Sequence, residues 1–126
     1  MKESELQVAV ADYLRLRYPN VLFHSDFGSG IKLTKGQAMK QKRQNGGRRG
    51  WPDMTVAQPV GKYHGLYLEL KKDKTRIFKK NGEYSSDHIA EQGCILDHLR
   101  LAGYRAEFAV GFEEAKEIID EYLGGK

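Results

Sequence analysis

Two acidic residues and a lysine stand at a spacing that could support hydrolysis. Asp53 follows a Trp-Pro pair, and residues 66–71 read LYLELK, which places Glu69 and Lys71 on either side of one leucine. Because side chains alternate between the two faces of a strand, Glu69 and Lys71 would share one face and the leucines the other. We expect the leucine face to pack against helices. The acid and the base would be close enough to act on one substrate atom.

The polar face of this strand could simply be exposed to solvent, since exposed Glu–Lys pairs are common and usually contribute little to stability. Asp53 changes this, because two strands joined by a short turn can bring it beside Glu69. Pro52 stiffens the backbone just before Asp53. Two neighbouring carboxylates repel each other unless a cation lies between them. Mg²⁺ or Mn²⁺ suits carboxylate and carbonyl oxygens, so we expect one of these ions as a cofactor.

The hydrophobic pattern predicts the elements that must position these residues. We expect helices over residues 4–18, 35–45, 87–102 and 112–123, and strands over 21–24, 53–58, 66–71 and 104–110. Ser4 and Gln7 fit a capping box at the start of the first helix. The central pair of strands favours an α/β fold with a mixed sheet of about four strands, flanked by helices.

One polar residue interrupts the apolar stripe of the third predicted helix. Ile89, Leu96 and Leu99 recur at helical spacing, and Gln92 falls among them. A buried amide needs a hydrogen-bond partner. Gln92 is therefore a candidate for the active site, or a glutamine at the core edge that bonds to backbone. Cys94, on the same helix, is expected to pack rather than to act as a nucleophile.

The composition indicates one compact domain over residues 1–126. The chain is 40% hydrophobic, enough to form a core. No apolar run approaches the roughly 18 residues of a membrane span. The first residues lack the pattern of a secretion signal. With one cysteine, and thus no intramolecular disulfide, we expect a reducing cytoplasm, in a bacterium or a phage-infected host cell.

The positive charge is segregated along the chain, which has a formal net charge of +4. No acid lies between Asp26 and Asp53, an interval that contains Lys32, Lys35, Lys40, Lys42, Arg43, Arg48 and Arg49. A second basic cluster contains Lys71, Lys72, Lys74, Arg76, Lys79 and Lys80, against Asp73 alone. Such segregation suits a polyanion such as nucleic acid, although a solvated lysine-rich surface is the alternative.

Five of these cations are assigned to DNA phosphates: Lys40, Lys42, Arg43, Arg48 and Arg49. Phosphate contacts position a duplex without reading its sequence, and they make binding salt-dependent. Trp51 could stack on a base or wedge a junction, or simply pack beside Pro52. The four histidines show no metal-ligand spacing, and only His88 is a weak candidate near the site.

The ordered set of motifs resembles a known nuclease family. "WPD" followed by "ELK" resembles the PD-(D/E)xK motif, and the chain as a whole resembles a stand-alone virus-type replication-repair nuclease (VRR-NUC) domain. The stretches "ESELQVAVADYLRLRYP", "GSGIKLTKGQAMKQKRQNGGRRGWPD" and "SSDHIAEQGCILDHLRLAGYRAEFAV" resemble the family's first helix, the segment before its catalytic aspartate, and its glutamine-bearing helix with the following strand. This resemblance implies a restriction-endonuclease-like core.

The resemblance also implies roles for particular residues. Asp53 and Glu69 would bind the metal, with the carbonyl of Leu70 as a further ligand. Lys71 would position or activate the attacking water and counter charge in the transition state, and Gln92 matches the family glutamine. Glu3 fits the spacing of the first-helix acid. Its neighbour on the same helix, Glu5, is the alternative.

The activity implied is metal-dependent endonuclease cleavage of branched DNA, such as four-way (Holliday) junctions, by a homodimer. Such an activity belongs to DNA repair. A nucleic-acid-binding protein that lost catalysis is an alternative, although Asp53, Glu69 and Lys71 are intact. A sequence-specific restriction-type enzyme is less favoured, because we expect no added recognition domain.

Overall fold

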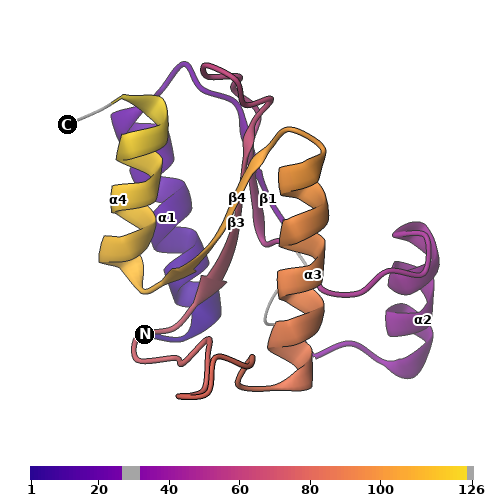
Figure 1. Cartoon of the computed structure of the whole chain (residues 1–126). Coiled ribbons are helices and arrows are strands. Elements are labelled where there is room, and N and C mark those ends of the chain that lie inside the picture. The colour runs from indigo at the N-terminus through magenta and orange to yellow at the C-terminus, as the bar shows by residue number, and fades with distance from the viewer. Residues whose placement is uncertain (27–31, 125–126) are drawn as a thin grey trace.

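The computed structural model describes residues 1–26 and 32–124, which form one sheet between two layers of helices (Figure 1). The helices are α1 (Glu3–Arg17), α2 (Lys35–Gln44), α3 (Asp87–Leu101) and α4 (Phe112–Leu123). The strands are β1 (Phe23–Ser25), β2 (Met54–Val56), β3 (Leu66–Lys71) and β4 (Arg105–Val110). This order of elements is the predicted one.

The four strands pair in the order β1-β2-β3-β4. β1 and β2, and likewise β2 and β3, run antiparallel, whereas β3 and β4 run parallel. The mixed four-stranded sheet expected from the sequence is thereby confirmed. Because β3 lies between β2 and β4, its C-terminal end is held on both sides by hydrogen-bonded neighbours.

The main core lies between the sheet and the helix pair α1 and α4. Leu66, Leu68 and Leu70 of β3 are fully buried there, as expected. A smaller core lies under α3 on the opposite face, where Leu96 packs with Ala106 and with the half-buried Tyr67. The second face of β3 is thus covered by α3, and Glu69 and Lys71 are buried rather than exposed.

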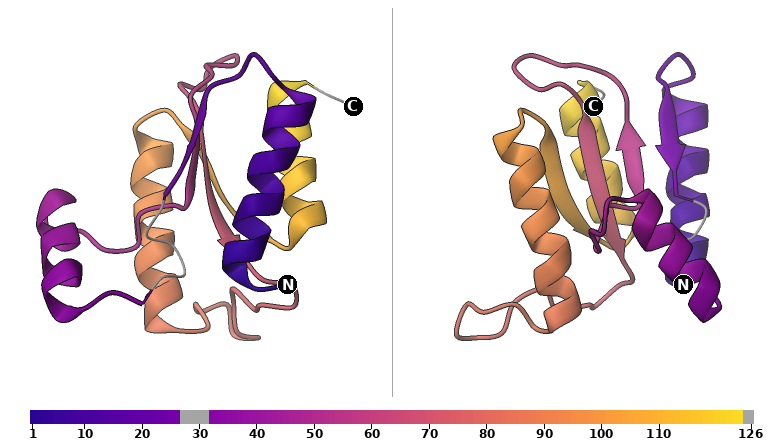
Figure 2. Two further views of the ribbon diagram at one scale, coloured as in Figure 1. Left: turned by 180° about the vertical axis from the view of Figure 1, so that it is seen from behind. Right: turned by 90° about the vertical axis from the view of Figure 1, so that its right-hand side faces the viewer.

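α2 stands apart from these layers. It begins after Thr34, whose side chain accepts a hydrogen bond from Gln37 N, and it buries no side chain. In two further views it projects beside the end of the sheet at which β3 finishes (Figure 2). A helix with no buried face is held by its cap and its flanking segments, so its basic surface stays open to solvent.

Three local predictions are wrong. The capping box at Ser4 does not form, because α1 starts one residue earlier, after Lys2, and Gln7 is buried. The first strand begins at Phe23, later than predicted. Cys94 is exposed on α3 and does not pack into the core. Among the described residues, no helix is long and apolar enough to cross a membrane.

Candidate active site

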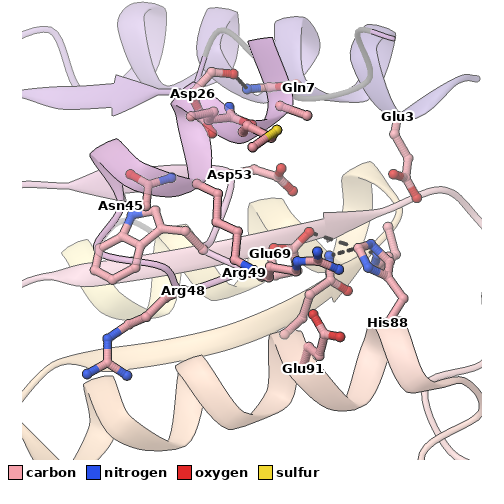
Figure 3. Close-up of a pocket in the computed structure, with 18 residues that line it drawn as sticks. Glu3, Gln7, Asp26, Asn45, Arg48, Arg49, Asp53, Glu69, His88 and Glu91 are labelled. Carbon is pink, nitrogen blue, oxygen red and sulfur yellow. Dashed lines mark hydrogen bonds and ion pairs between the residues drawn. The ribbon is translucent and has the colours of Figure 1, made fainter. Parts of the chain in front are cut away.

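A cleft of about 770 Å³ opens between α1, α2, α3 and the adjoining end of the sheet. Its walls carry acids from three parts of the chain, and Glu3, Asp53, Glu69 and Glu91 converge on it (Figure 3). Basic side chains line its outer wall, and the buried end of β3 forms its floor. The residues predicted at the active site therefore share one cavity.

Asp53 and Glu69 are brought together by strand register. β2 and β3 pair Met54 with Leu68, so one step further along the antiparallel ladder Asp53 comes opposite Glu69. Asp53 Oδ2 accepts a hydrogen bond of 2.7 Å from the backbone N–H of Leu70. This bond fixes the Asp53 carboxylate against β3, beyond the last paired residue of β2.

Glu69 is 3% exposed, and this burial is costly for a carboxylate. Burial, followed by the charge of Asp53 and a hydrogen bond with it, raises the pKa of Glu69 to about 10, against an opposing effect of Lys71. Glu3 adds a smaller repulsion in the same direction. The site thus concentrates negative charge beyond what its own lysine can balance.

Lys71 is the cation next to this pair. Its side chain is almost fully buried, and Nζ lies 3.9 Å from Glu69 Oε2. Lys71 lines the cleft together with Asp53 and Glu69, so the three side chains predicted from the sequence face the same space. The Lys71 ammonium lies next to Oε2 of Glu69, so Oε1 of the same carboxyl group has no positive charge beside it.

Two buried oxygens in the described part of the chain have no hydrogen-bond partner: Glu69 Oε1 and Gln92 Oε1. Both residues line the cleft. In an extended strand the N–H and C=O of one residue point to the same side, so the carbonyl of Leu70 faces the Asp53 side of β3. Oxygen ligands from two carboxylates and one carbonyl fit Mg²⁺ or Mn²⁺.

Within the described ranges, no group of three or more His, Cys, Asp and Glu side chains is arranged to hold a metal. A divalent ion would therefore be held by two carboxylates and one backbone carbonyl, and water and substrate oxygens would complete its coordination. Mg²⁺ commonly binds in this way, through one or two carboxylates and substrate phosphates.

Gln92 reaches the cleft from α3. It is 6% exposed, and its Nε2 lies 3.3 Å from Nε2 of His88, one turn earlier on the same helix. The alternative that Gln92 bonds to backbone is not supported, because its amide nitrogen contacts the His88 side chain. Glu91, which the sequence analysis did not single out, lines the cleft next to Gln92.

The structure separates the two acids of the first helix. Glu3 lines the cleft, whereas the Glu5 carboxylate accepts a hydrogen bond of 3.3 Å from the backbone N–H of Lys2. Glu5 thus caps α1, and Glu3 is the acid directed toward the site. The buried Gln7 donates to Ser25 Oγ at 2.5 Å and to the carbonyl of Asp26 at 2.8 Å, which ties α1 to the rim of the cleft.

Comparison with known proteins adds to this geometry. No family model matches the sequence, and no curated protein sequence matches it. A solved structure described as "VRR_NUC domain protein" superposes with a TM-score of 0.69 at 25% identity, covering 98% of this chain and 89% of that one. A second, described as "VRR_NUC domain", gives a TM-score of 0.50 at 23% identity, covering 93% and 97%, and supports the fold.

The chain is similar to VRR-NUC domains over almost its whole length. The resemblance inferred from the sequence is thus confirmed, and with it an α/β nuclease core. The roles predicted for single residues remain predictions. The structure shows where each of these residues lies.

The predicted phosphate contacts divide into two groups. Lys42, Arg48 and Arg49 line the cleft, whereas Lys40 and Arg43 lie on α2 outside its lining. All five side chains are exposed. Apart from Lys71, the cations that line the cleft therefore come from α2 and from the loop that follows it, residues 45–50, which together form the outer wall.

Trp51 also lines the cleft. It is 43% exposed, and its ring meets Tyr67 edge-to-face at 5.6 Å. The neighbouring Pro52 is fully buried. One edge of the indole is therefore fixed by an aromatic neighbour, while the remainder is available to a ligand.

Gly50 is a further residue that the sequence analysis did not single out. Its φ is +80°, and a Cβ there would lie 2.9 Å from the backbone nitrogen of Gln92. Only glycine permits this approach of the segment before Asp53 to α3. The glycine thereby sets the distance between the basic wall and α3.

Proposed function

We propose that this VRR-NUC domain is a Mg²⁺- or Mn²⁺-dependent endonuclease that hydrolyses phosphodiester bonds in DNA. The observation that carries the proposal is the pairing of Asp53 with Glu69. Glu69 is buried, its pKa is strongly raised, and one of its oxygens has no partner in the described structure. A divalent cation would supply the missing positive charge.

Asp53 and Glu69 would hold the ion, together with the carbonyl of Leu70. When bound, the ion supplies charge neutralisation at a phosphoryl oxygen and a lowered pKa for bound water. The chain contributes a rigid pair of ligands, because Asp53 is fixed by the Leu70 N–H and Glu69 is packed at the end of β3. Little reorganisation would be needed when a phosphate enters.

Lys71 would act on the attacking water and on the charge that develops at the phosphorus. Its ammonium is restrained by Glu69 and faces the cleft, so it can donate to a water or to a phosphoryl oxygen. Gln92 offers an unpartnered carbonyl oxygen and Glu3 a carboxylate in the same space. Either could accept a hydrogen bond from the attacking water or from water around the ion.

The basic wall supports DNA as the substrate. Lys42, Arg48 and Arg49 line the same cleft as the acids, and phosphate contacts there would place the backbone over Asp53 and Glu69. We extend the proposal to branched DNA such as four-way junctions and to a homodimer acting in DNA repair, because the chain resembles stand-alone VRR-NUC members. A cytoplasmic location remains a prediction.

The test is cleavage of a panel of labelled DNAs with Mg²⁺ or Mn²⁺ and with EDTA. The panel contains a linear duplex, a flap and a four-way junction. We expect wild-type protein to cut the junction preferentially and EDTA to abolish cutting. Asp53→Asn and Lys71→Ala should each lose on the order of 100-fold or more in rate, the scale of losing one charge-stabilising group, while still binding DNA.

Two results would contradict the proposal. Binding without cleavage by the wild type, under every metal condition, would indicate a non-catalytic binding module. Cutting of linear duplex at one sequence, with no preference for branches, would indicate a restriction-type enzyme instead.

A further inference from the structure

A second basic surface lies apart from the α2 segment. It is the loop between β3 and α3, which we call the basic hairpin, residues 72–84. Its five cations are all exposed: Lys72, Lys74, Arg76, Lys79 and Lys80. Of its two acids, Asp73 is directed toward Gly111, where an added Cβ would collide with its carboxylate. The hairpin therefore presents a strongly positive surface.

The basic hairpin has a defined backbone. Lys79 N donates to the carbonyl of Glu83 at 2.7 Å, and Ser85 N donates to the carbonyl of Ile77 at 2.9 Å. At the tip, Glu83 N donates to Asn81 Oδ1 at 3.0 Å. A ligand that binds here would meet preformed cation positions, so little backbone entropy would be lost on binding.

An aromatic pair anchors the basic hairpin to α3. The rings of Phe78 and Tyr84 stack with centroids 4.9 Å apart. Tyr84 in turn lies against Gly93, where any side chain on α3 would collide with the Tyr84 ring. Phe78 remains 52% exposed at the surface. Exposed aromatic rings between cations are typical of nucleic-acid-binding surfaces.

The cations of the basic hairpin differ from those on the rest of the domain. Arg100, Arg105 and Lys116 each have a carboxylate within ion-pair distance. In the described part of the chain, none of the five hairpin cations has one. Unpaired like charges repel each other, so an external polyanion would relieve this repulsion.

The hairpin is continuous with the candidate active site. Lys72 follows Lys71 directly, and α3 begins just after the hairpin and carries His88 into the cleft. Seen from the side, α2 and the hairpin lie on opposite sides of the end of β3 (Figure 2, right). The end of β3, which carries Glu69 and Lys71, therefore has a basic segment on either side.

We infer that the basic hairpin is a second binding surface for the phosphate backbone of DNA, and that it holds the DNA on the side of the cleft away from α2. This inference rests on the proposed function for its choice of DNA. Arg76, Lys79 and Lys80 neutralise phosphates without reading sequence, and their contribution is additional to that of the α2 cations.

The test measures binding of a labelled four-way junction and a linear duplex to Asp53→Asn protein with Ca²⁺, so that cleavage does not interfere. A triple variant, Arg76→Ala/Lys79→Ala/Lys80→Ala, is compared with a control of equal charge change, Arg15→Ala/Arg17→Ala/Lys62→Ala. The control residues lie at the C-terminal end of α1 and in the loop between β2 and β3, and none of them lines the cleft. Circular dichroism and melting temperature check that both variants are folded.

We expect the hairpin variant to bind about 10-fold more weakly at about 0.1 M salt, and the slope of log K against log salt to fall by about 2 to 3, near 0.9 for each lost phosphate contact. The control should stay within about twofold. Lys79→Glu/Lys80→Glu should bind more weakly still. Unchanged affinity and slope in the hairpin variants would overturn the inference.

Failure of this inference and failure of the proposed function are distinguishable. If wild-type protein cuts no DNA but the hairpin variant loses affinity, the second surface stands without the nuclease assignment. If wild-type protein cuts junctions, and the hairpin substitutions change neither binding in the Asp53→Asn background nor cutting in the wild-type background, the nuclease assignment stands and the second surface is wrong.

Discussion

Glu69 is the side chain on which the candidate active site depends. Folding buries it beside Asp53 and leaves one oxygen without a partner in the described structure. With its pKa raised to about 10, mainly by burial, the metal-free protein holds this carboxyl protonated at neutral pH. A divalent ion must displace that proton, so metal affinity should increase as the pH rises.

Replacement of Glu69 by glutamine should change how the stability of the metal-free protein depends on pH. The unfolded chain releases the Glu69 proton near the ordinary pKa, whereas the folded chain keeps it until about pH 10. Between these values the free energy of unfolding falls as the pH rises. In Glu69→Gln this decrease is absent. Urea unfolding in EDTA at pH 5 and pH 9 would measure it.

The matched control is Glu83→Gln, a change at an exposed acid of the loop before α3. It should leave the pH dependence of the wild type intact. If Glu69→Gln and wild type lose the same free energy of unfolding between pH 5 and pH 9, the Glu69 carboxyl is not held protonated in the folded protein.

At the scale of elements, two contacts place the acids. The β2–β3 register sets Asp53 opposite Glu69, and Gly50 lets the preceding segment lie against the backbone of α3. The register depends on the buried leucine face of β3, since a one-residue slip would turn the acids into the main core. The Gly50 contact depends on the absence of a side chain.

Gly50→Ala should destabilise the protein and impair the site together. A Cβ at this position meets the backbone of Glu91 and Gln92, and a φ of +80° is strained for alanine. We expect a loss of about 1–3 kcal/mol in the free energy of unfolding, the usual cost of backbone strain. Chemical denaturation measures the stability, and the junction assay measures activity under conditions in which the variant is folded.

Gly36→Ala is the control, because Gly36 lies in α2 with nothing within 4 Å of the added Cβ. Alanine favours a helix over glycine by roughly 0.5–1 kcal/mol, so this change should not destabilise the protein. Equal stability of Gly50→Ala and wild type would show that the segment before Asp53 does not lie against α3.

The sequence predicts the elements better than their contacts. Apolar patterns locate most of the helices and strands, whereas the basic, weakly amphipathic α2 is indicated mainly by the Gly46-Gly47 pair that follows it. The strand alternation of LYLELK indicates which side chains share a face. The contacts of Gly50 and Gln7 were missed, because each depends on a partner far away along the chain. Gln7 fits a local capping pattern equally well, and only the position of β1 shows that it holds Ser25 instead.

For the whole molecule, charge is divided between two regions. The arginines and lysines of α3, β4 and α4 are paired with acids. Within the described ranges, those of α2 and the basic hairpin have no carboxylate within ion-pair distance. Two open basic surfaces near one acidic centre are suited to guiding a polyanion onto the proposed metal site. The formal net charge of +4 understates this asymmetry.

Removal of positive charge from α2 should weaken DNA binding equally for all sequences. For Lys40→Ala/Lys42→Ala/Arg43→Ala we expect the slope of log K against log salt to fall by about 2 to 3, because each phosphate contact contributes about 0.9. Fluorescence anisotropy with two unrelated duplexes across a salt series measures this. A loss confined to one of the two duplexes would contradict a role in phosphate contact.

The central claim is that Asp53 and Glu69 hold a divalent ion at the end of β3. The most direct measurement is an anomalous difference map from crystals soaked in Mn²⁺. We expect a peak between the two carboxylates and the carbonyl of Leu70. A map with no peak between well-ordered Asp53 and Glu69 side chains, at Mn²⁺ concentrations that support cleavage, would contradict it.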